Sequence, residues 1–306
     1  MSPSTVKTGI LCRVGAALGA LCFLAWLLAC RTLAQSAAPK PTADPKFSKE
    51  SIANSDSQRE RIKQELAGHN LPEWAGNYYY GDGEGVNVDL RLAPKSGFVA
   101  TWNGCLGLYD LNFGNVAWAD GKVGLRFTYP NNPLHRGFEG FPEELIPVRW
   151  AGRHYLIPAD QMIEFANEIN RGSEPRKSPR GLFLLKRGDE KKSAPGTPAL
   201  PTSYAAYILK KPIRTTVVSV GSSRVVGDES FSDRHTQVVL NAGQAEGVKV
   251  GMEFYVYGPG SSFASAKITK TEEHTSQAEL EQDEFPNLPK EPAPAVGWKL
   301  STAFER

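Results

Sequence analysis

The sequence predicts a mainly β protein with two small antiparallel β-barrel or sandwich domains, the first covered by one helix. Three observations predict this class. Apolar and polar residues alternate over short segments, most clearly over residues 86–92. Turn-forming Gly, Asn and Asp residues separate these segments at intervals of roughly eight to twelve residues. Cys105 is the single cysteine beyond residue 34, so a hydrophobic core without disulfides must hold each domain.

Residues 1–34 have the features of a secretory signal. Lys7 and Arg13 give a positively charged start, and small residues follow an uncharged apolar stretch over residues 14–29. That stretch is short for a membrane span, which needs about 20 apolar residues. We therefore expect an exported protein, located in the periplasm or cell envelope.

The end of this segment leaves three outcomes open. Residues 27–30, Leu-Leu-Ala-Cys, resemble the lipobox of bacterial lipoproteins, although Leu28 stands where a small residue is usual. The resemblance implies lipidation of Cys30 and a membrane tether, since each buried CH₂ of an acyl chain contributes about 0.8 kcal/mol. Cleavage after Ala34 would instead release a soluble protein, and retention of the segment would leave an uncleaved anchor.

Residues 35–70 are predicted to be a flexible tether that contains a short helix. The first part is rich in Ala, Pro, Ser and Lys and is too poor in large apolar residues to fold. A helix is expected over residues 56–67, where Ile62 and Leu66 form a narrow apolar stripe. We expect this stripe to pack on a neighbouring element.

Residues 71–187 are predicted to form the first β-domain. Asp120-Gly121 predicts a hairpin because glycine accepts the positive φ that such turns require, and Ala151-Gly152 predicts another. Strands are expected over residues 86–92, 98–102, 108–113, 123–129, 147–150, 154–158 and 181–187.

One amphipathic helix is expected in this domain, capped by Asp160 and ended at Gly172. Its apolar side is formed by Met162, Ile163, Phe165, Ala166 and Ile169. These patterns predict an antiparallel meander closed into a barrel or curled sheet, with this helix covering it.

Residues 188–211 are predicted to be a Pro-rich linker, and residues 212–306 a small β-barrel. Short strands spaced by turns are typical of such a barrel. They are expected over residues 215–220, 235–240, 253–257, 265–271, 276–280 and 298–302.

Residues 241–254, NAGQAEGVKVGMEF, place three glycines at four-residue spacing, and Val248 and Val250 alternate between them. This segment resembles the N-x-G-x-x-x-G-V-x-x-G-x-x-F turn of small β-barrels in bacterial envelope proteins. The C-terminal domains of flagellar assembly T proteins and of rod-shape-determining C proteins carry similar turns. The resemblance covers residues 212–306. It implies a barrel that packs against other envelope components and has no catalytic residues.

The charge balance gives no reason to expect nucleic acid as a partner. The chain has 35 basic and 33 acidic residues, for a net charge of +2. Three of the basic residues lie in residues 1–34, so the remaining chain is close to neutral. A nucleic-acid-binding surface normally requires a marked excess of basic residues.

Cys105 is the first candidate for catalysis. Gly104 and Gly107 flank it, but no histidine lies near it in the sequence, and a nucleophilic cysteine needs an imidazole close by. A free cysteine is more often a small buried hydrophobic residue. Enzymatic use of Cys105 is therefore the least favoured of the functions considered.

Two short clusters place carboxylates beside imidazoles. Asp233 lies two residues before His235, and Glu272 and Glu273 precede His274. Zinc sites need three or four ligands, so we expect loop polarity to explain both clusters.

Asp82, Glu84 and Asp89 could form a carboxylate group, but the surrounding glycines favour a hairpin loop without the ligand spacing of a calcium site. Phosphate-binding and serine-hydrolase motifs are absent from the sequence. We therefore expect no catalytic residue, no metal site and no cofactor.

Aromatic residues crowd the first domain. Exposed aromatic rings can stack on sugars or fill a pocket of a partner. Small barrels are usually filled by their own side chains, so core packing is the competing role. The possible ligand or partner contacts are Trp74, Tyr79, Trp102 and Trp118.

Together these features predict an exported, membrane-tethered, non-enzymatic protein of the bacterial envelope that acts as a binding or adaptor module. The expected partners are the membrane, through the N-terminus, and other envelope proteins. The alternative is a ligand-carrying barrel that holds a lipid, glycan or other small molecule near Trp102 and Trp118. A Cys105-dependent enzyme is the third hypothesis.

Overall fold

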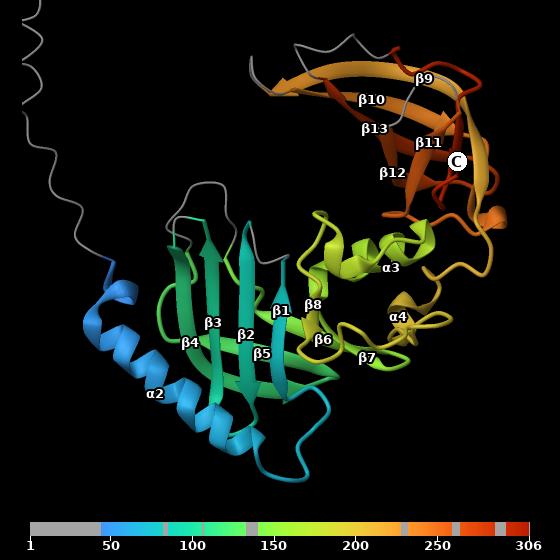
Figure 1. Cartoon of the computed structure of the whole chain (residues 1–306). Helices are drawn as coiled ribbons and strands as arrows, with labels where there is room; N and C mark the ends of the chain where they lie inside the picture. The colour runs from blue at the N-terminus through green and yellow to red at the C-terminus, as the bar shows by residue number, and fades with distance from the viewer. Residues whose placement is uncertain are drawn as a thin grey trace, which may run out of the picture. The chain divides into compact units, whose positions relative to one another are not determined.

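The computed structural model describes most of the chain beyond residue 43 (Figure 1). The predicted signal and Cys30 lie outside the described residues, as do Asp82 and Glu84. The described ranges are residues 44–81, 85–105, 107–132, 140–227, 232–258, 264–284 and 292–305.

The chain divides into two compact units, residues 1–48 and residues 49–306. The described part of the first unit contains the short 3₁₀ helix η1 (Pro45–Phe47). None of the helices in the described ranges is long and apolar enough to cross a membrane.

Residues 49–306 are mainly β and contain two closed antiparallel barrels, as predicted. In the first barrel each strand pairs with the next along the chain, and the eighth strand closes the sheet by pairing with the first. The strands are β1 (Gly76–Tyr80), β2 (Asn87–Ala93), β3 (Gly97–Gly104), β4 (Gly107–Ala119), β5 (Lys122–Phe127), β6 (Glu144–Trp150), β7 (Arg153–Pro158) and β8 (Leu184–Lys186).

The predicted hairpins of the first barrel are present. Asp120 (φ 52°) and Gly121 (φ 75°) join β4 to β5 with positive φ at both central positions, as a tight hairpin turn requires. Ala151 also has positive φ, 49°, between β6 and β7. The fourth strand is longer than the predicted residues 108–113, and β8 is shorter than the predicted residues 181–187.

The interior of the first barrel is filled by apolar side chains. Strand β2 shows the expected alternation, with Val88, Leu90 and Leu92 buried. Burial of these side chains is the main force holding a domain that has no disulfide. The buried cluster contains Trp74, Ala75, Tyr78, Val88, Leu90, Leu92, Phe98, Ala100, Val123, Leu125, Phe141, Leu145, Leu156 and Leu184.

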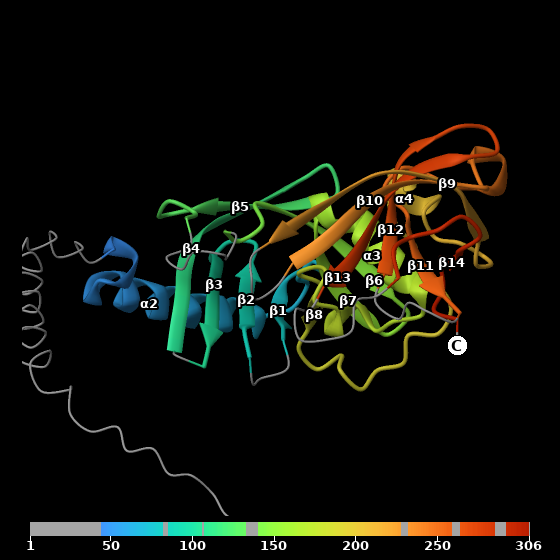
Figure 2. The same ribbon diagram turned by 90° about the horizontal axis from the view of Figure 1, so that it is seen from above.

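Helix α2 (Lys49–Leu66) packs against the outer face of β2, β3 and β4 (Figure 2). It begins well before the predicted residue 56, inside the segment expected to be a flexible tether. Its buried face follows helical spacing through Ser51, Ser55, Gln58 and Ile62. Three of these four residues are polar, so an apolar pattern could not mark the start of this helix.

Helix α3 (Met162–Arg171) covers the outer face of β6, β7 and β8, as expected. Met162 and Phe165 are fully buried there, and Gly172 ends the helix with a φ of 84°. The predicted Asp160 cap is wrong. Asp160 lies in the 3₁₀ helix η2 (Ala159–Gln161), and no side chain caps the N-terminus of α3.

The second barrel has the strand order β10-β13-β12-β11-β14-β9. Its interior contains apolar residues from every strand, including Val217, Leu240, Phe254 and Leu280. Its strands are β9 (Arg214–Gly227), β10 (Ser232–Leu240), β11 (Glu253–Tyr257), β12 (Ala264–Thr271), β13 (Ser276–Glu284) and β14 (Lys299–Ser301).

The glycine-rich segment 241–254 leads from β10 to β11 and packs on α3. Gly251 has a φ of 87°, and a Cβ at this position would lie 3.2 Å from a methyl carbon of Ile163. The Asn167 amide donates to Gly251 O (3.0 Å), and its oxygen accepts from the backbone N of Glu253 (3.2 Å). Gly251 thus serves both the turn and the contact with α3.

The segment between the barrels also has ordered contacts. It contains the short helix α4 (Thr202–Ala205), and the indole of Trp150 donates to Gly196 O (2.9 Å). Asn170 on α3 donates to Tyr207 O (2.8 Å) and accepts from the backbone N of Leu209 (2.9 Å). Much of the predicted linker therefore lies against the elements it connects.

Candidate functional site

The structure brings Trp74 and Trp118 together and places Trp102 and Tyr79 elsewhere. The indole rings of Trp74 and Trp118 stack, with centroids 5.9 Å apart and planes 13° apart. Trp74 is buried, whereas Trp118, near the β4–β5 hairpin, is 51% exposed. The stack therefore presents one indole to solvent, where it can contact a ligand or a partner.

Trp102 is only partly buried and lines a surface hollow of about 480 Å³. Its ring lies 5.7 Å from that of Phe141, at the same hollow. Asn131, Asp160 and Gln161 supply polar groups to the lining. The hollow is large enough for a small molecule.

Tyr79 takes part in a charged cluster. The guanidinium groups of Arg187 and Arg176 lie 4.7 Å and 5.5 Å from the centre of its ring, within cation–π range. Partial burial raises the pKa of Tyr79. Arg187 also donates to both carboxylate oxygens of Asp89 at 2.8 Å. These contacts give Tyr79 a structural role in joining β1, β2 and the chain after β8.

Cys105 is exposed, so the expected burial of this thiol is wrong. It follows β3 at the β3–β4 turn, and its Sγ lies 3.8 Å from Tyr109 Oη. A tyrosine hydroxyl is a much weaker base than an imidazole, so this neighbour does not supply the activation that a nucleophilic cysteine needs.

The sequence pattern did not predict a network of hydrogen bonds and ion pairs around His154. Its Nδ1 lies 2.7 Å from Asp189 Oδ2, and its Nε2 lies 2.8 Å from Glu73 Oε1. Asp189 is buried and also accepts from the backbone N of His154 and from Lys192 Nζ (2.6 Å). Both ring nitrogens are therefore engaged by carboxylates, which leaves neither free to take a proton from a substrate.

Burial of Asp189 works to raise its pKa, but hydrogen bonds from Lys192 and His154 outweigh this effect and lower the pKa. The only sequence signal was a histidine in a predicted strand, because Glu73 is 81 positions from His154 in the chain.

Strand β9 exposes an apolar ribbon. Four of the ten large hydrophobic side chains that are exposed in the described ranges lie on it: Val218, Val220, Val225 and Val226. It pairs with β10 along one edge, but pairing with β14 on the other edge covers only residues 214–216. Beyond Val217, that second edge has no strand partner in the described part of the chain.

A charged cleft of about 500 Å³ lies between α3 and the outer face of the second barrel. Glu164 on α3 pairs with Lys267 (2.8 Å), and Arg180 pairs with Glu253 (2.5 Å). The ring of Tyr255 lies under both Arg180 and Arg171. Strand β13 adds further carboxylates to the lining: Glu279, Glu281 and Asp283.

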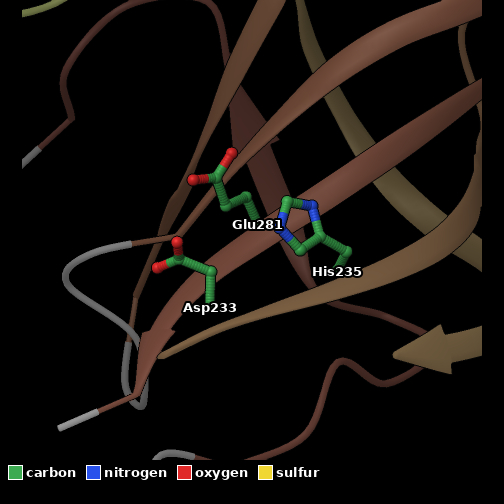
Figure 3. A group of neighbouring side chains, drawn as sticks. All are labelled: Asp233, His235 and Glu281. Atoms are coloured by element: carbon green, nitrogen blue, oxygen red, sulfur yellow. The ribbon is translucent and has the colours of Figure 1, made fainter. Parts of the chain in front are cut away.

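Asp233 and His235 lie inside strand β10, so loop polarity does not explain them as expected. Their side chains meet that of Glu281 from β13 on the outer face of the second barrel (Figure 3). The other predicted cluster does lie in a loop, where His274 Nδ1 contacts Glu246 Oε1 at 3.2 Å.

Comparison with protein-family models, with curated proteins and with solved structures found no match. Any inference about function therefore depends on the surfaces and contacts described above.

Proposed function

We propose that this chain is an exported, membrane-tethered, non-enzymatic module of the bacterial envelope that binds an extended segment of a partner protein along β9. The edge of β9 that has no strand partner in the described ranges is the observation that carries the binding part of this proposal. The N-terminal features and the envelope-type turn at residues 241–254 support the location.

An unpaired strand edge offers backbone N–H and C=O groups that a further strand can satisfy. Natural proteins usually protect such edges with lysine, proline or inward-pointing charge. Residues 218–227 contain one charged residue, Arg224, and its guanidinium is engaged by Glu279 at 2.6 Å. Exposed valines beside this edge favour a partner strand that also carries apolar residues. Two register shifts bend β9, and the added strand would follow that bend.

The groups best suited to catalysis support a non-enzymatic role. Both nitrogens of His154 contact carboxylates, and the thiol of Cys105 lies beside a tyrosine hydroxyl. Neither arrangement leaves a base beside a free nucleophile.

Photo-crosslinking in the native host tests the binding surface. A benzoylphenylalanine placed at Val225 of the full chain is expected to give one crosslinked partner, attached through an extended segment that mass spectrometry identifies. Adding Val218→Lys and Val220→Lys should lower the yield more than about tenfold, since these residues line the proposed contact. The probe placed at Ile52 on α2, another exposed apolar position, is the matched control.

Equal adducts from Val225 and Ile52, or a yield that the lysines leave unchanged, would contradict binding at β9. Circular dichroism of the purified lysine variant checks that the barrels remain folded.

The membrane tether is tested by intact mass and membrane fractionation, with Cys30→Ser as the control. A mature chain that begins at an acylated Cys30 and leaves the membrane in the variant is the expected result. A soluble chain that begins at Gln35 would refute the tether.

Small-molecule binding is the second candidate function, and the hollow beside Trp102 is the observation that favours it. A lipid or glycan bound there should shift tryptophan fluorescence in the full chain but not in Trp102→Phe. Native mass spectrometry without an adduct, together with unchanged fluorescence across a ligand panel, would remove this candidate.

A further inference from the structure

Three side chains that commonly bind metals meet on the outer face of the second barrel (Figure 3). His235 on β10 and Glu281 on β13 are direct cross-strand partners, and Asp233 lies two residues before His235 on the same face. One potential ligand atom from each residue lies within 4.8 Å of the others. The pairing of β10 with β13 creates this cluster.

Two nearby arginine side chains form ion pairs with carboxylates outside this cluster. Arg224 pairs with Glu279, and Arg180 pairs with Glu253. Within the described ranges, neither Asp233 nor Glu281 forms an ion pair with a lysine or arginine. The cluster therefore holds negative charge that no lysine or arginine of the described ranges neutralises through an ion pair.

Two atoms of the cluster are shielded from solvent without a hydrogen-bond partner in the described part of the chain. They are Asp233 Oδ1 and His235 Nδ1, the latter 3.7 Å from a Glu279 oxygen. Buried polar atoms are rarely left unpaired, and binding of an ion is one of the recognised explanations for an exception.

We propose that Asp233, His235 and Glu281 bind a divalent transition-metal ion, with Zn²⁺ as the best-suited probe. One imidazole with two carboxylates is a donor set that suits Zn²⁺ better than Mg²⁺ or Ca²⁺, which prefer oxygen alone. Zinc binds these donors at about 2.0–2.2 Å, so two of its ligand atoms lie at most about 4.4 Å apart. Glu281 is exposed and can rotate inward to close the remaining distance.

The bound ion would satisfy the two shielded atoms and link β10 to β13. Three protein ligands leave at least one position for water, so the site would be open on its solvent side. A short sequence motif could not reveal this site, because Glu281 comes from a strand far from His235 in the chain.

Isothermal titration of the full, untagged, metal-free chain with Zn²⁺ tests the proposal. All proteins carry serine at the four cysteine positions, because exposed thiols also bind zinc. One site is expected in this background, with affinity reduced more than about tenfold by His235→Gln and by Glu281→Gln. His274→Gln is the matched control, because His274 also lies beside carboxylates but is 67% exposed in a loop.

Equal Zn²⁺ affinity in the background and in His235→Gln would overturn the proposal, as would loss of the site in His274→Gln or no binding at all. Thermal unfolding provides a second measurement, in which Zn²⁺ is expected to raise the Tm of the background and not that of Glu281→Gln. Glu281 is exposed, so its variant also decides the question if His235→Gln fails to fold.

Discussion

At the scale of single residues, the contacts of Asp189 show how one buried carboxylate organises its surroundings. Its carboxylate contacts the ring of His154, accepts a hydrogen bond from the backbone N–H of the same residue and forms an ion pair with Lys192. Its side chain is only 3% exposed, so removing its charge would leave these donors without a charged acceptor in a poorly solvated place. Asp189 therefore fastens the start of the predicted linker to β7.

Asp189→Asn is expected to lower the free energy of unfolding by about 2–3 kcal/mol at pH 7. Because the folded-state pKa of Asp189 is lowered, its stabilisation is present above the unfolded pKa of about 3.9 and is lost as pH falls through the folded value. Chemical denaturation at pH 7 and pH 3 measures the free energy of unfolding of both proteins. The difference between variant and wild type should be smaller at pH 3 than at pH 7.

Asp56→Asn is the control for this prediction, because Asp56 is 61% exposed and, among the described residues, pairs only with Arg59 on the surface of α2. It should leave the unfolding curve unchanged within error. A constant difference between Asp189→Asn and wild type at both pH values would show that the charge of Asp189 does not stabilise the fold.

At the scale of elements, a polar contact fixes α2 on the first barrel. The Gln58 Nε2 lies within hydrogen-bond distance of Ser96 O (3.1 Å), Phe98 O (3.1 Å) and Gly114 O (2.7 Å). Gly97, between two of these residues, has a φ of 78°, and a Cβ there would lie 2.0 Å from Gly114 O. The helix, the β2–β3 turn and β4 therefore meet in a space that admits only glycine at residue 97.

Gln58→Leu is expected to destabilise the protein by about 1–3 kcal/mol, because the carbonyls of Phe98 and Gly114 lose a buried donor. Gln64→Leu on the exposed side of the same helix is the control, since it makes the same substitution without touching the barrel. Thermal unfolding of both variants measures the difference. Equal Tm values would show that Gln58 does not anchor α2.

At the scale of the whole molecule, α3 belongs to the first barrel but also contacts the second. Asn167 is 3% exposed and is hydrogen-bonded to both Gly251 and Glu253. Glu164, one helical turn earlier, pairs with Lys267. The same helix thus covers β6–β8 and contacts the turn that follows β10.

Asn167→Ala is expected to weaken the contact between α3 and the second barrel by about 1–3 kcal/mol. The substitution leaves Gly251 O and the Glu253 N–H without the hydrogen-bond partners that Asn167 provides. Tryptic cleavage after the exposed Lys210, between the barrels, should then become faster. Asn115→Ala, on the exposed side of β4, is the control. Cleavage at the wild-type rate in Asn167→Ala would show that this amide does not hold the barrels together.

The sequence by itself determined the local features of this protein. The alternation in β2, the Asp120-Gly121 hairpin and the end of α3 at Gly172 are set by residues a few positions apart, so each could be predicted. The start of α2 was missed because Ser51, Ser55 and Gln58 form a buried face without an apolar signal.

Only the tertiary structure decided which distant side chains meet. Glu73 reaches His154 across 81 positions, and Glu281 reaches His235 through the register of two strands. The Trp74–Trp118 stack and the β9 edge that lacks a strand partner among the described residues likewise depend on how strands pair. The local sequence pattern specifies which face of a strand a residue occupies. The neighbours of that residue depend on strand order and register, and these are set when the barrels close.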